Sequence, residues 1–471
     1  MPRVILRYDR GTLLALGGFR IPGSVYDERL GVYRAAAIRY SDALEYIRAS
    51  GLDYQDEVMD PIPAPRLVSK TPLRPYQATA LRNWSLNGKK GVVVLPTGAG
   101  KTLVGIKAVE SVGLSALVVV PTLDLLWQWK EALEKELDLE VGVLGGESFE
   151  LKAITVSTYD SAYLRAAELG NKFYLLVFDE CHHLPSEGYR QIAEMFASPY
   201  RLGLTATPER EDGLHRDLAW LIGGLVYRAS PSQLAGRYLS EYRVEKIVVN
   251  LTPEEKIAYE AERAKFTSYV RRMRIYPWDS RGLLKLIMMS GRDPDAREAL
   301  LARNRATQIA FNSEAKLKSL EKILKENRQE KIIVFTQYND LVYQISSRFL
   351  MPFITYKTSP SERADVLKKF KDGEYGAIVA SKVLDEGVDV PEASLGVILS
   401  GSGSTREFVQ RLGRLLRKRE GKLARLIEIV SAGTSEMSVS YRRGRRLRQP
   451  GGPSAEGLAE ERGEGVCFSP P

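Results

Sequence analysis

The chain has 471 residues, 44% of them hydrophobic and 27% charged, which is typical of a globular protein with about two to four domains. Two cysteines exclude a disulfide framework, and the lack of a long apolar run or a signal-peptide pattern predicts an intracellular, cytoplasmic protein without a membrane partner. The net charge of +9 favours a nucleic-acid partner, although a basic enzyme without one fits the charge equally well.

Residues 1–65 predict a small α+β module that carries no recognisable chemistry. Strand-like runs at 4–8 and 12–16 are joined by the turn signal Asp9-Arg-Gly, and helical spacing extends from the cap residue Ser41 to Gly51. The proline-rich residues 60–66 cannot continue a helix or a central strand, so a domain boundary is expected there.

Short apolar runs alternate with helical segments in two later regions, 70–235 and 312–432. Strands that alternate with helices imply right-handed βαβ units and mostly parallel sheets. The sequence therefore predicts two similar α/β domains, one after the other. The expected strands are 91–95, 116–120, 154–157, 174–178 and 201–205 in the first domain, and 331–335, 353–355, 376–380, 395–399 and 425–429 in the second.

Between these regions, residues 245–305 predict a helical insertion. Residues 270–278 are basic with interleaved aromatic side chains, which suits a segment that grips a nucleic-acid backbone. An amphipathic helical hairpin with a solvated basic face fits equally well. After the second domain, residues 433–471 hold a cationic cluster at 441–448 and then a Gly/Pro/Glu-rich tail, for which disorder is predicted.

A glycine-rich segment after the first strand of the 70–235 region predicts a nucleotide site. It reads Pro96-Thr97-Gly98-Ala99-Gly100-Lys101-Thr102 and precedes a helical run. Glycines there let backbone N–H groups converge on phosphate oxygens at a helix N-terminus. Lys101 would reach the outer phosphates of ATP, and Thr102 would offer its hydroxyl to Mg²⁺. The strict motif has glycine where this chain has Leu95, but the strand–loop–helix context compensates.

Two adjacent acids, Asp179 and Glu180, follow the apolar run 174–178 and should lie at the rim of the sheet, where open α/β folds bind ligands. We expect Asp179 to bind Mg²⁺, directly or through water, and Glu180 to position the attacking water. A metal site at Cys181-His182-His183 is disfavoured because consecutive side chains point in different directions. His182 and His183 are instead expected to link the nucleotide state to neighbouring segments.

A third motif, Gln410-Arg411-Leu-Gly-Arg414-Leu-Leu-Arg417, places Arg414 and Arg417 on one helix face. Guanidinium groups there would reach the γ-phosphate across a cleft between the two α/β domains, as arginine fingers do. A salt-bridged surface helix is the structural alternative. It is disfavoured because the same chain also carries Lys101 and the two acids.

Together these motifs resemble a superfamily 2 helicase from Leu73 to about Ile429, with a DExH-type motif II at Asp179–His182. The resemblance implies tandem RecA-like domains and catalytic roles for Lys101, Asp179, Glu180, Gln410, Arg414 and Arg417. It also implies adenine contacts near Arg74 and Gln77 and a motif V with Gly387 and Asp389. The coupling or nucleic-acid contacts that it implies are Thr122 in motif Ia, Thr158 in Ib, Thr205 and Thr207 in III, and Thr336 in IV.

The resemblance narrows to the XPB family of archaeal type. Arg210-Glu211-Asp212 follows motif III at once, as in that family, and motif II has the form Asp-Glu-x-His-His-Leu-Pro. The helical insertion resembles the family's thumb, and the N-terminal module resembles its damage-recognition domain, although no motif in the module reads a lesion. We expect Arg210, Glu211 and Asp212 to act at the DNA fork, by helping strand separation or by linking the domains; a charged surface turn is the alternative.

The resemblance implies an ATP- and Mg²⁺-dependent 3′–5′ DNA helicase or duplex translocase that opens DNA in repair or transcription. It implies sequence-independent backbone contacts, a nuclease partner and a nucleoid-associated place in a prokaryotic cell. An RNA helicase or a restriction-type DNA motor is the alternative within the class. A non-catalytic scaffold that binds DNA and a partner is the alternative of another class, and the presence of every key site residue argues against it.

Overall fold

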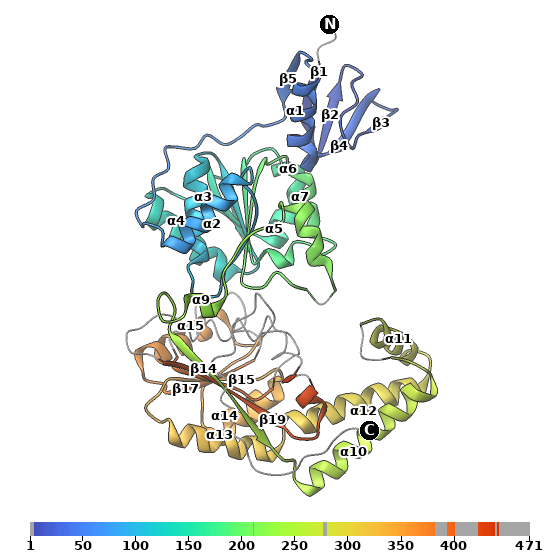
Figure 1. Ribbon diagram of the computed structural model, residues 1–471, viewed down its shortest axis with the longest axis vertical. Coiled ribbons are helices and arrows are strands. Elements are labelled where there is room, and N and C mark those ends of the chain that lie inside the picture. The colour runs from blue at the N-terminus through green and yellow to red at the C-terminus, as the bar shows by residue number, and fades with distance from the viewer. Residues whose placement is uncertain are drawn as a thin grey trace. The chain divides into compact units, whose positions relative to one another are not determined.

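The computed structural model describes residues 4–210, 212–276, 280–381, 393–400, 423–438 and 440–441. The chain forms two compact units, residues 1–230 and 231–471 (Figure 1). Within the described residues no helix is long and apolar enough to cross a membrane.

The N-terminal module is a five-stranded sheet that is covered by helix α1 (Tyr40–Ala49). Strands β1 and β2 form the expected hairpin, and its turn residues Arg10 and Gly11 both have positive φ, at 44° and 92°. Leu6, Leu13 and Ile47 are fully buried between sheet and helix. The strands lie in the order β3 (Val25–Asp27), β4 (Val32–Ala36), β2 (Thr12–Leu16), β1 (Val4–Asp9) and β5 (Tyr54–Glu57).

This module packs directly on the α/β domain that follows it in the first unit. The Tyr8 hydroxyl lies 3.2 Å from the carbonyl oxygen of Met195, and Ala197 is part of the module's buried core. The Asn171 side-chain amide donates to the carbonyl of Val58 at 3.1 Å. These contacts fix the module to one end of the domain, so the two form a single unit.

The first α/β domain contains an eight-stranded sheet that is parallel except for its β8–β9 pair. Figure 1 shows helices α3 and α4 on one face and α5 and α7 on the other. The strand order is β13 (Leu225–Arg228), β6 (Lys90–Val94), β12 (Tyr200–Thr205), β11 (Leu175–Asp179), β7 (Ala116–Val120), β10 (Ile154–Thr158), β8 (Gly142–Gly145) and β9 (Ser148–Glu150). The helices are α2 (Pro75–Leu86), α3 (Lys101–Val112), α4 (Leu123–Leu137), α5 (Tyr159–Leu164), α6 (Ala166–Leu169), α7 (Arg190–Met195) and α8 (Leu218–Leu221).

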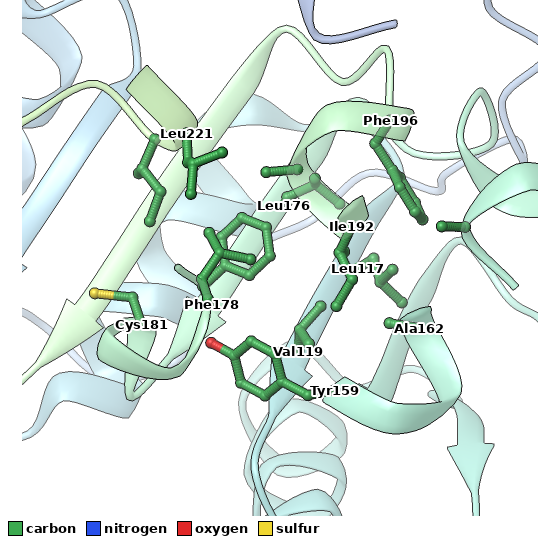
Figure 2. Close-up of a cluster of buried hydrophobic side chains, with 14 of the residues drawn as sticks. Leu117, Val119, Tyr159, Ala162, Leu176, Phe178, Cys181, Ile192, Phe196 and Leu221 are labelled. Atoms are coloured by element: carbon green, nitrogen blue, oxygen red, sulfur yellow. The ribbon is translucent and has the colours of Figure 1, made fainter. Parts of the chain in front are cut away.

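Strand β11 lies in the middle of this sheet, and every one of its residues is buried. Leu176 and Phe178 project from one face, where Tyr159 and Ile192 cover them (Figure 2). A strand buried on both faces needs a continuous apolar sequence, which is the pattern that predicted it. Burial of β11 fixes the position at which its two terminal acids leave the sheet.

The second unit holds a six-stranded parallel sheet and a helical insertion. The strands lie in the order β14 (Glu241–Val249), β19 (Leu423–Ser431), β18 (Leu395–Ile398), β15 (Ile332–Phe335), β17 (Ala377–Ala380) and β16 (Phe353–Ile354). The other helices are α9 (Pro231–Leu234), α13 (Glu314–Glu326), α14 (Asn339–Phe349) and α15 (Pro360–Asp372). Two parallel-sheet domains, an insertion and an N-terminal α+β module confirm the predicted fold class.

The insertion consists of α10 (Pro253–Arg272), α11 (Ser280–Ser290) and α12 (Pro294–Phe311). Figure 1 shows α10 and α12 side by side, with α11 at the far end of the pair. Helix α10 begins with a capping box, in which the Thr252 hydroxyl accepts from the Glu255 N–H while the Glu255 carboxylate accepts from the Thr252 N–H. The small residues Ala299 and Ala302 of α12 are buried, which allows close helix packing.

Candidate active site

The glycine-rich loop connects β6 to α3, which begins at Lys101. Gly98 and Gly100 have positive φ, at 83° and 74°, a region that L side chains rarely adopt. A Cβ atom on Gly100 would also lie 2.5 Å from Nε2 of Gln77. The loop therefore requires glycine at position 100, and it brings backbone N–H groups to the N-terminus of a twelve-residue helix.

The upstream element at the start of α2 supports this loop from behind. Gln77 is buried, and its side-chain amide donates to the carbonyl oxygens of Ala99 at 2.9 Å and Gly100 at 3.3 Å. Its other end accepts the backbone N–H of Arg74 at 2.9 Å. The Tyr76 hydroxyl donates to the same Ala99 carbonyl at 2.7 Å. Tyr76 therefore also supports the loop, although the sequence motifs did not indicate it as a site residue. The adenine contacts of Arg74 and Gln77 remain a prediction.

Lys101 and Glu180 form an ion pair, with 3.2 Å between Nζ and Oε1. Both side chains are nearly buried, so solvent screens the pair only weakly. Glu180 has a left-handed backbone, with φ at 45°, at the turn that ends β11. The structure therefore brings together the lysine of the glycine-rich loop and the second acid of motif II, as expected from two parallel strands that end at one edge of the sheet.

The other oxygen of Glu180, Oε2, accepts the Thr205 hydroxyl at 3.0 Å. Nδ1 of His182 lies 3.1 Å from the same hydroxyl and 3.4 Å from the Glu180 carboxylate. The backbone N–H of Thr207 also donates to the Thr205 hydroxyl, at 3.2 Å. Motif II and motif III are thus joined through Thr205, while the ring of His183 packs against those of His182 and Tyr159.

Asp179 is buried at the end of β11, and each of its carboxylate oxygens accepts a hydrogen bond. The indole N–H of Trp129 donates to Oδ2 at 2.8 Å, and the backbone N–H of Glu180 donates to Oδ1 at 3.0 Å. Burial and the neighbouring charge of Glu180 raise the pKa of Asp179 to about 6, against the opposing effects of Lys101 and Trp129. Tyr159 donates to the Asp179 carbonyl at 3.1 Å. A buried carboxylate of this kind favours a compensating cation.

The predicted Mg²⁺ ligands, Thr102 and Asp179, offer one hydroxyl and one carboxylate at the same edge of the sheet. Mg²⁺ commonly retains several waters and takes one or two protein carboxylates together with substrate phosphates. This small donor set fits such an ion. Within the described ranges, no group of three or more His, Cys, Asp or Glu side chains could hold a metal, including the Cys181-His182-His183 run.

The threonines of motifs Ia and Ib begin helices at the carboxyl ends of β7 and β10. The Thr122 hydroxyl accepts from the backbone N–H of Leu125 at 3.3 Å, and the Thr158 hydroxyl accepts from Ser161 at 3.2 Å. Both are therefore N-caps, a role sufficient to explain a threonine there. Their predicted nucleic-acid contacts are untested.

Arg210 connects the segment after motif III to motif II. Its guanidinium donates to the carbonyl of His182 at 2.7 Å and forms a bidentate pair with Asp212, with 2.6 Å between Nη2 and Oδ2. The hydrogen bond from Arg210 lowers the pKa of Asp212 to about 2. Glu211, the third member of this element, lies outside the described residues.

In the second unit, Thr336 is fully buried at the end of β15. Its hydroxyl lies 2.7 Å from that of Ser400, which follows β18, so it joins the ends of two neighbouring strands. Its predicted coupling role stays a prediction. The remaining predicted residues lie outside the described residues: Gly387, Asp389, Gln410, Arg414 and Arg417.

Trp129 is the main site residue that sequence reasoning missed. Helix α4 buries Leu126, Trp129, Leu133 and Leu137, a spacing that assigns all four to a helix core face. Nothing in that periodicity distinguishes an indole that packs from one that also donates to an acid. An aromatic N–H on the core face of a helix beside β11 was the available signal.

Three family models match the chain. Residues 6–58 match the Xeroderma pigmentosum group B helicase damage recognition domain, residues 70–210 match the res subunit of type III restriction enzymes, and residues 315–419 match the helicase conserved C-terminal domain.

Curated relatives extend this match to nearly the whole chain. The DNA 3′-5′ translocase XPB2 of Sulfurisphaera tokodaii is 49% identical over 440 residues, which cover 93% of this chain and 99% of that protein. The DNA 3′-5′ helicase XPB of Kineococcus radiotolerans is 30% identical over 80% of this chain and 63% of its own length. Among solved structures, the Hef helicase domain of Pyrococcus furiosus aligns with a TM-score of 0.55 and 21% identity, over 78% of this chain and 97% of that one.

Proposed function

The chain belongs to the XPB family of superfamily 2 helicases, and from this premise we propose that it is an ATP-dependent 3′–5′ DNA helicase or duplex translocase that opens DNA in repair or transcription. The observation that carries the proposal is the meeting of Lys101, Asp179 and Glu180 at one edge of a parallel sheet. ATP is the nucleotide implied by the helicase domains.

The triphosphate would bind at the N-terminus of α3, where the loop's N–H groups and the helix dipole favour negative charge. Phosphate oxygens would then compete with Glu180 for Lys101, whose ammonium group lies 3.2 Å from Oε1 of Glu180. Binding of ATP thereby releases Glu180 from its ion pair.

Once released, Glu180 would orient the attacking water and accept its proton. The Thr205 hydroxyl still donates to Oε2 and holds the carboxylate in place. Thr102 and Asp179 would hold Mg²⁺, which supplies charge neutralisation for the transferred phosphoryl group. Gln410, Arg414 and Arg417 would complete the site from the second domain, with Gly387 and Asp389 nearby.

ATP hydrolysis would be coupled to DNA through the hydrogen bonds that connect Glu180 to motif III and to the segment after it. His182 and Thr205 join it to motif III, and Arg210 joins the His182 carbonyl to Asp212. Glu180, the proposed base, is therefore one hydrogen bond away from Thr205 of motif III. This arrangement suits an enzyme in which hydrolysis alters the grip on a strand.

DNA contacts would come from the helical insertion and from the motifs of both domains that are expected to contact the DNA backbone. Arg271, Arg272, Arg274 and Tyr276 are exposed at the α10 end of the insertion, where they could grip phosphates and stack on bases. We also propose a protein partner such as a repair nuclease, and a place on the nucleoid of a prokaryotic cell. The zebrafish relative of this family is a subunit of general transcription and DNA repair factor IIH.

The experiment is ATP hydrolysis by the wild type and by Lys101→Ala, with no nucleic acid, single-stranded DNA, forked DNA or RNA. We expect DNA to stimulate the wild type, and the variant to be inactive throughout. Stimulation by RNA alone would favour the RNA-helicase alternative, and no stimulation by any nucleic acid would reject the motor.

A further inference from the structure

Trp129 connects three parts of the first α/β domain that carry the nucleotide chemistry. It lies on α4, its indole N–H donates to Asp179 at the end of β11, and its ring packs against α3, the helix that begins at Lys101. The side chain is 1% exposed. A buried indole N–H needs an acceptor, and here the acceptor is the predicted Mg²⁺-side acid.

The neighbouring helix is shaped to admit this ring. A Cβ atom on Gly105 of α3 would lie 2.5 Å from Cη2 of Trp129, closer than real atoms approach. Gly105 has no positive φ that would demand glycine, so space for the indole is what its lack of a side chain provides. The indole thus reaches Asp179 through a gap that only glycine leaves open.

We propose that Trp129 is a positioning residue of the ATPase site, which holds the Asp179 carboxylate in the orientation that the metal-bound nucleotide requires and ties it to α4. This rests on the proposed function. The two oxygens of Asp179 are distinguished by their donors, since Oδ2 faces Trp129 and Oδ1 faces the Glu180 N–H. Without the indole N–H, one end of the carboxylate loses its fixed direction.

Thr122 of motif Ia is the N-cap of helix α4, seven residues before Trp129 and about 10 Å along the helix axis. A single hydrogen bond from Trp129 therefore joins the helix capped by a proposed DNA-contacting residue to the predicted Mg²⁺-side acid.

The test uses Trp129→Phe, which keeps an aromatic ring and removes the donor. Trp84→Phe is the matched control, because Trp84 is also fully buried in this domain and its indole donates to a backbone carbonyl, that of Arg201, at 2.9 Å. Gly105→Ala is a second variant, which keeps the donor and displaces the ring.

Calorimetric binding of ADP is measured with and without Mg²⁺ for the full chain. We expect Mg²⁺ to strengthen ADP binding in the wild type and in Trp84→Phe. In Trp129→Phe this gain should fall about tenfold or more, the usual effect of removing a hydrogen-bond partner of a metal-binding carboxylate, while metal-free ADP binding stays at the wild-type value. Gly105→Ala should lose part of the gain.

An undiminished gain in Trp129→Phe would overturn the positioning role and leave the proposed ATPase intact. An equal loss in Trp84→Phe would also overturn it, because the effect would then reflect domain stability. A wild-type chain that binds no ADP would overturn the nucleotide site itself, and the role of Trp129 with it.

Discussion

At the scale of single residues, Glu180 joins the lysine of the glycine-rich loop to motif III. This carboxylate neutralises Lys101 and accepts the Thr205 hydroxyl. Glu180→Gln keeps an oxygen that can accept from Thr205 but cannot take a proton. We predict ATP binding within a few-fold of the wild type and hydrolysis reduced at least about 100-fold, as expected for loss of a general base.

Single-turnover hydrolysis and ATP binding measure these two effects separately. Glu194→Gln is the control, because Glu194 lies in the same domain and forms an ion pair with Arg190, at 3.0 Å, on the domain surface. If Glu180→Gln hydrolysed ATP at the rate of the control, Glu180 would not be the general base.

Gly100 offers a second prediction at this scale. In Gly100→Ala, the new Cβ must displace the Gln77 amide, and the backbone at φ 74° is strained as well. We predict at least a tenfold loss of ADP affinity, measured by calorimetry. Adding Gln77→Ala removes the collision but keeps the strain and also removes the hydrogen bonds of Gln77 to the loop, so affinity should stay below the wild-type value. Wild-type affinity in the double variant would mean that strain at Gly100 is unimportant.

At the scale of elements, the segment after motif III is tied to motif II through Arg210. Replacing Arg210, Glu211 and Asp212 together with alanine leaves Lys101, Asp179 and Glu180 in place. We predict DNA-stimulated ATPase activity within about twofold of the wild type and a clear loss of fork unwinding. Strand displacement and ATP hydrolysis are measured side by side. Unwinding equal to that of the wild type would contradict a role of these three residues at the DNA fork.

Helix α13 is anchored to the segment after β19 by a buried ion pair. Lys316 and Glu436 are 1% and 5% exposed, with 2.6 Å between Nζ and Oε1, and Nζ also donates to the carbonyl of Leu399. Lys316→Ala leaves a buried carboxylate uncompensated, which costs about 3–5 kcal/mol.

Hydrogen exchange at the amides of β19 and α13 should therefore accelerate strongly in Lys316→Ala. The exposed Lys318, on the same helix, serves as the control, and Lys318→Ala should leave exchange unchanged. Equal protection in both variants would show that the pair adds little to the stability of this domain.

Elements with a continuous apolar run were predictable, and elements defined by their partners were not. The five expected strands of the first domain and the five of the second all form, because a strand that is buried on both faces has a continuous apolar sequence. Strands β8, β9, β13 and β14 were missed. The last three are edge strands, which lack such a run: β14, for example, alternates exposed with half-buried residues. β8 is buried inside the sheet, but its four residues include a glycine at each end and leave only two apolar residues between them. β14 pairs along its whole length with β19, a partner about 180 residues away that no local pattern indicates.

The site likewise contains residues that the sequence predicts and contacts that only the folded chain creates. Loop glycines, Lys101 and the two acids follow from motif spacing, because phosphate binding restricts residue type and order. The Trp129–Asp179 contact depends on packing between helix and sheet, and the Gln77 contact on tertiary folding of α2. Such contacts leave no periodic trace in a single sequence.

At the scale of the whole molecule, the first unit carries Lys101, Asp179 and Glu180, and the second carries the segment with Arg414 and Arg417, which lies outside the described residues. A motor of this family must use ATP to change the relation of two such domains. We therefore propose that hydrolysis at the Lys101–Glu180 site drives DNA opening.

The most direct measurement is strand displacement from duplexes that carry either a 3′ or a 5′ single-stranded tail, with wild type and Glu180→Gln, in the presence and absence of ATP. We predict that the wild type with ATP displaces the strand from the 3′-tailed duplex, and that the variant does not. Displacement that is independent of ATP, or equal in the variant, would contradict it.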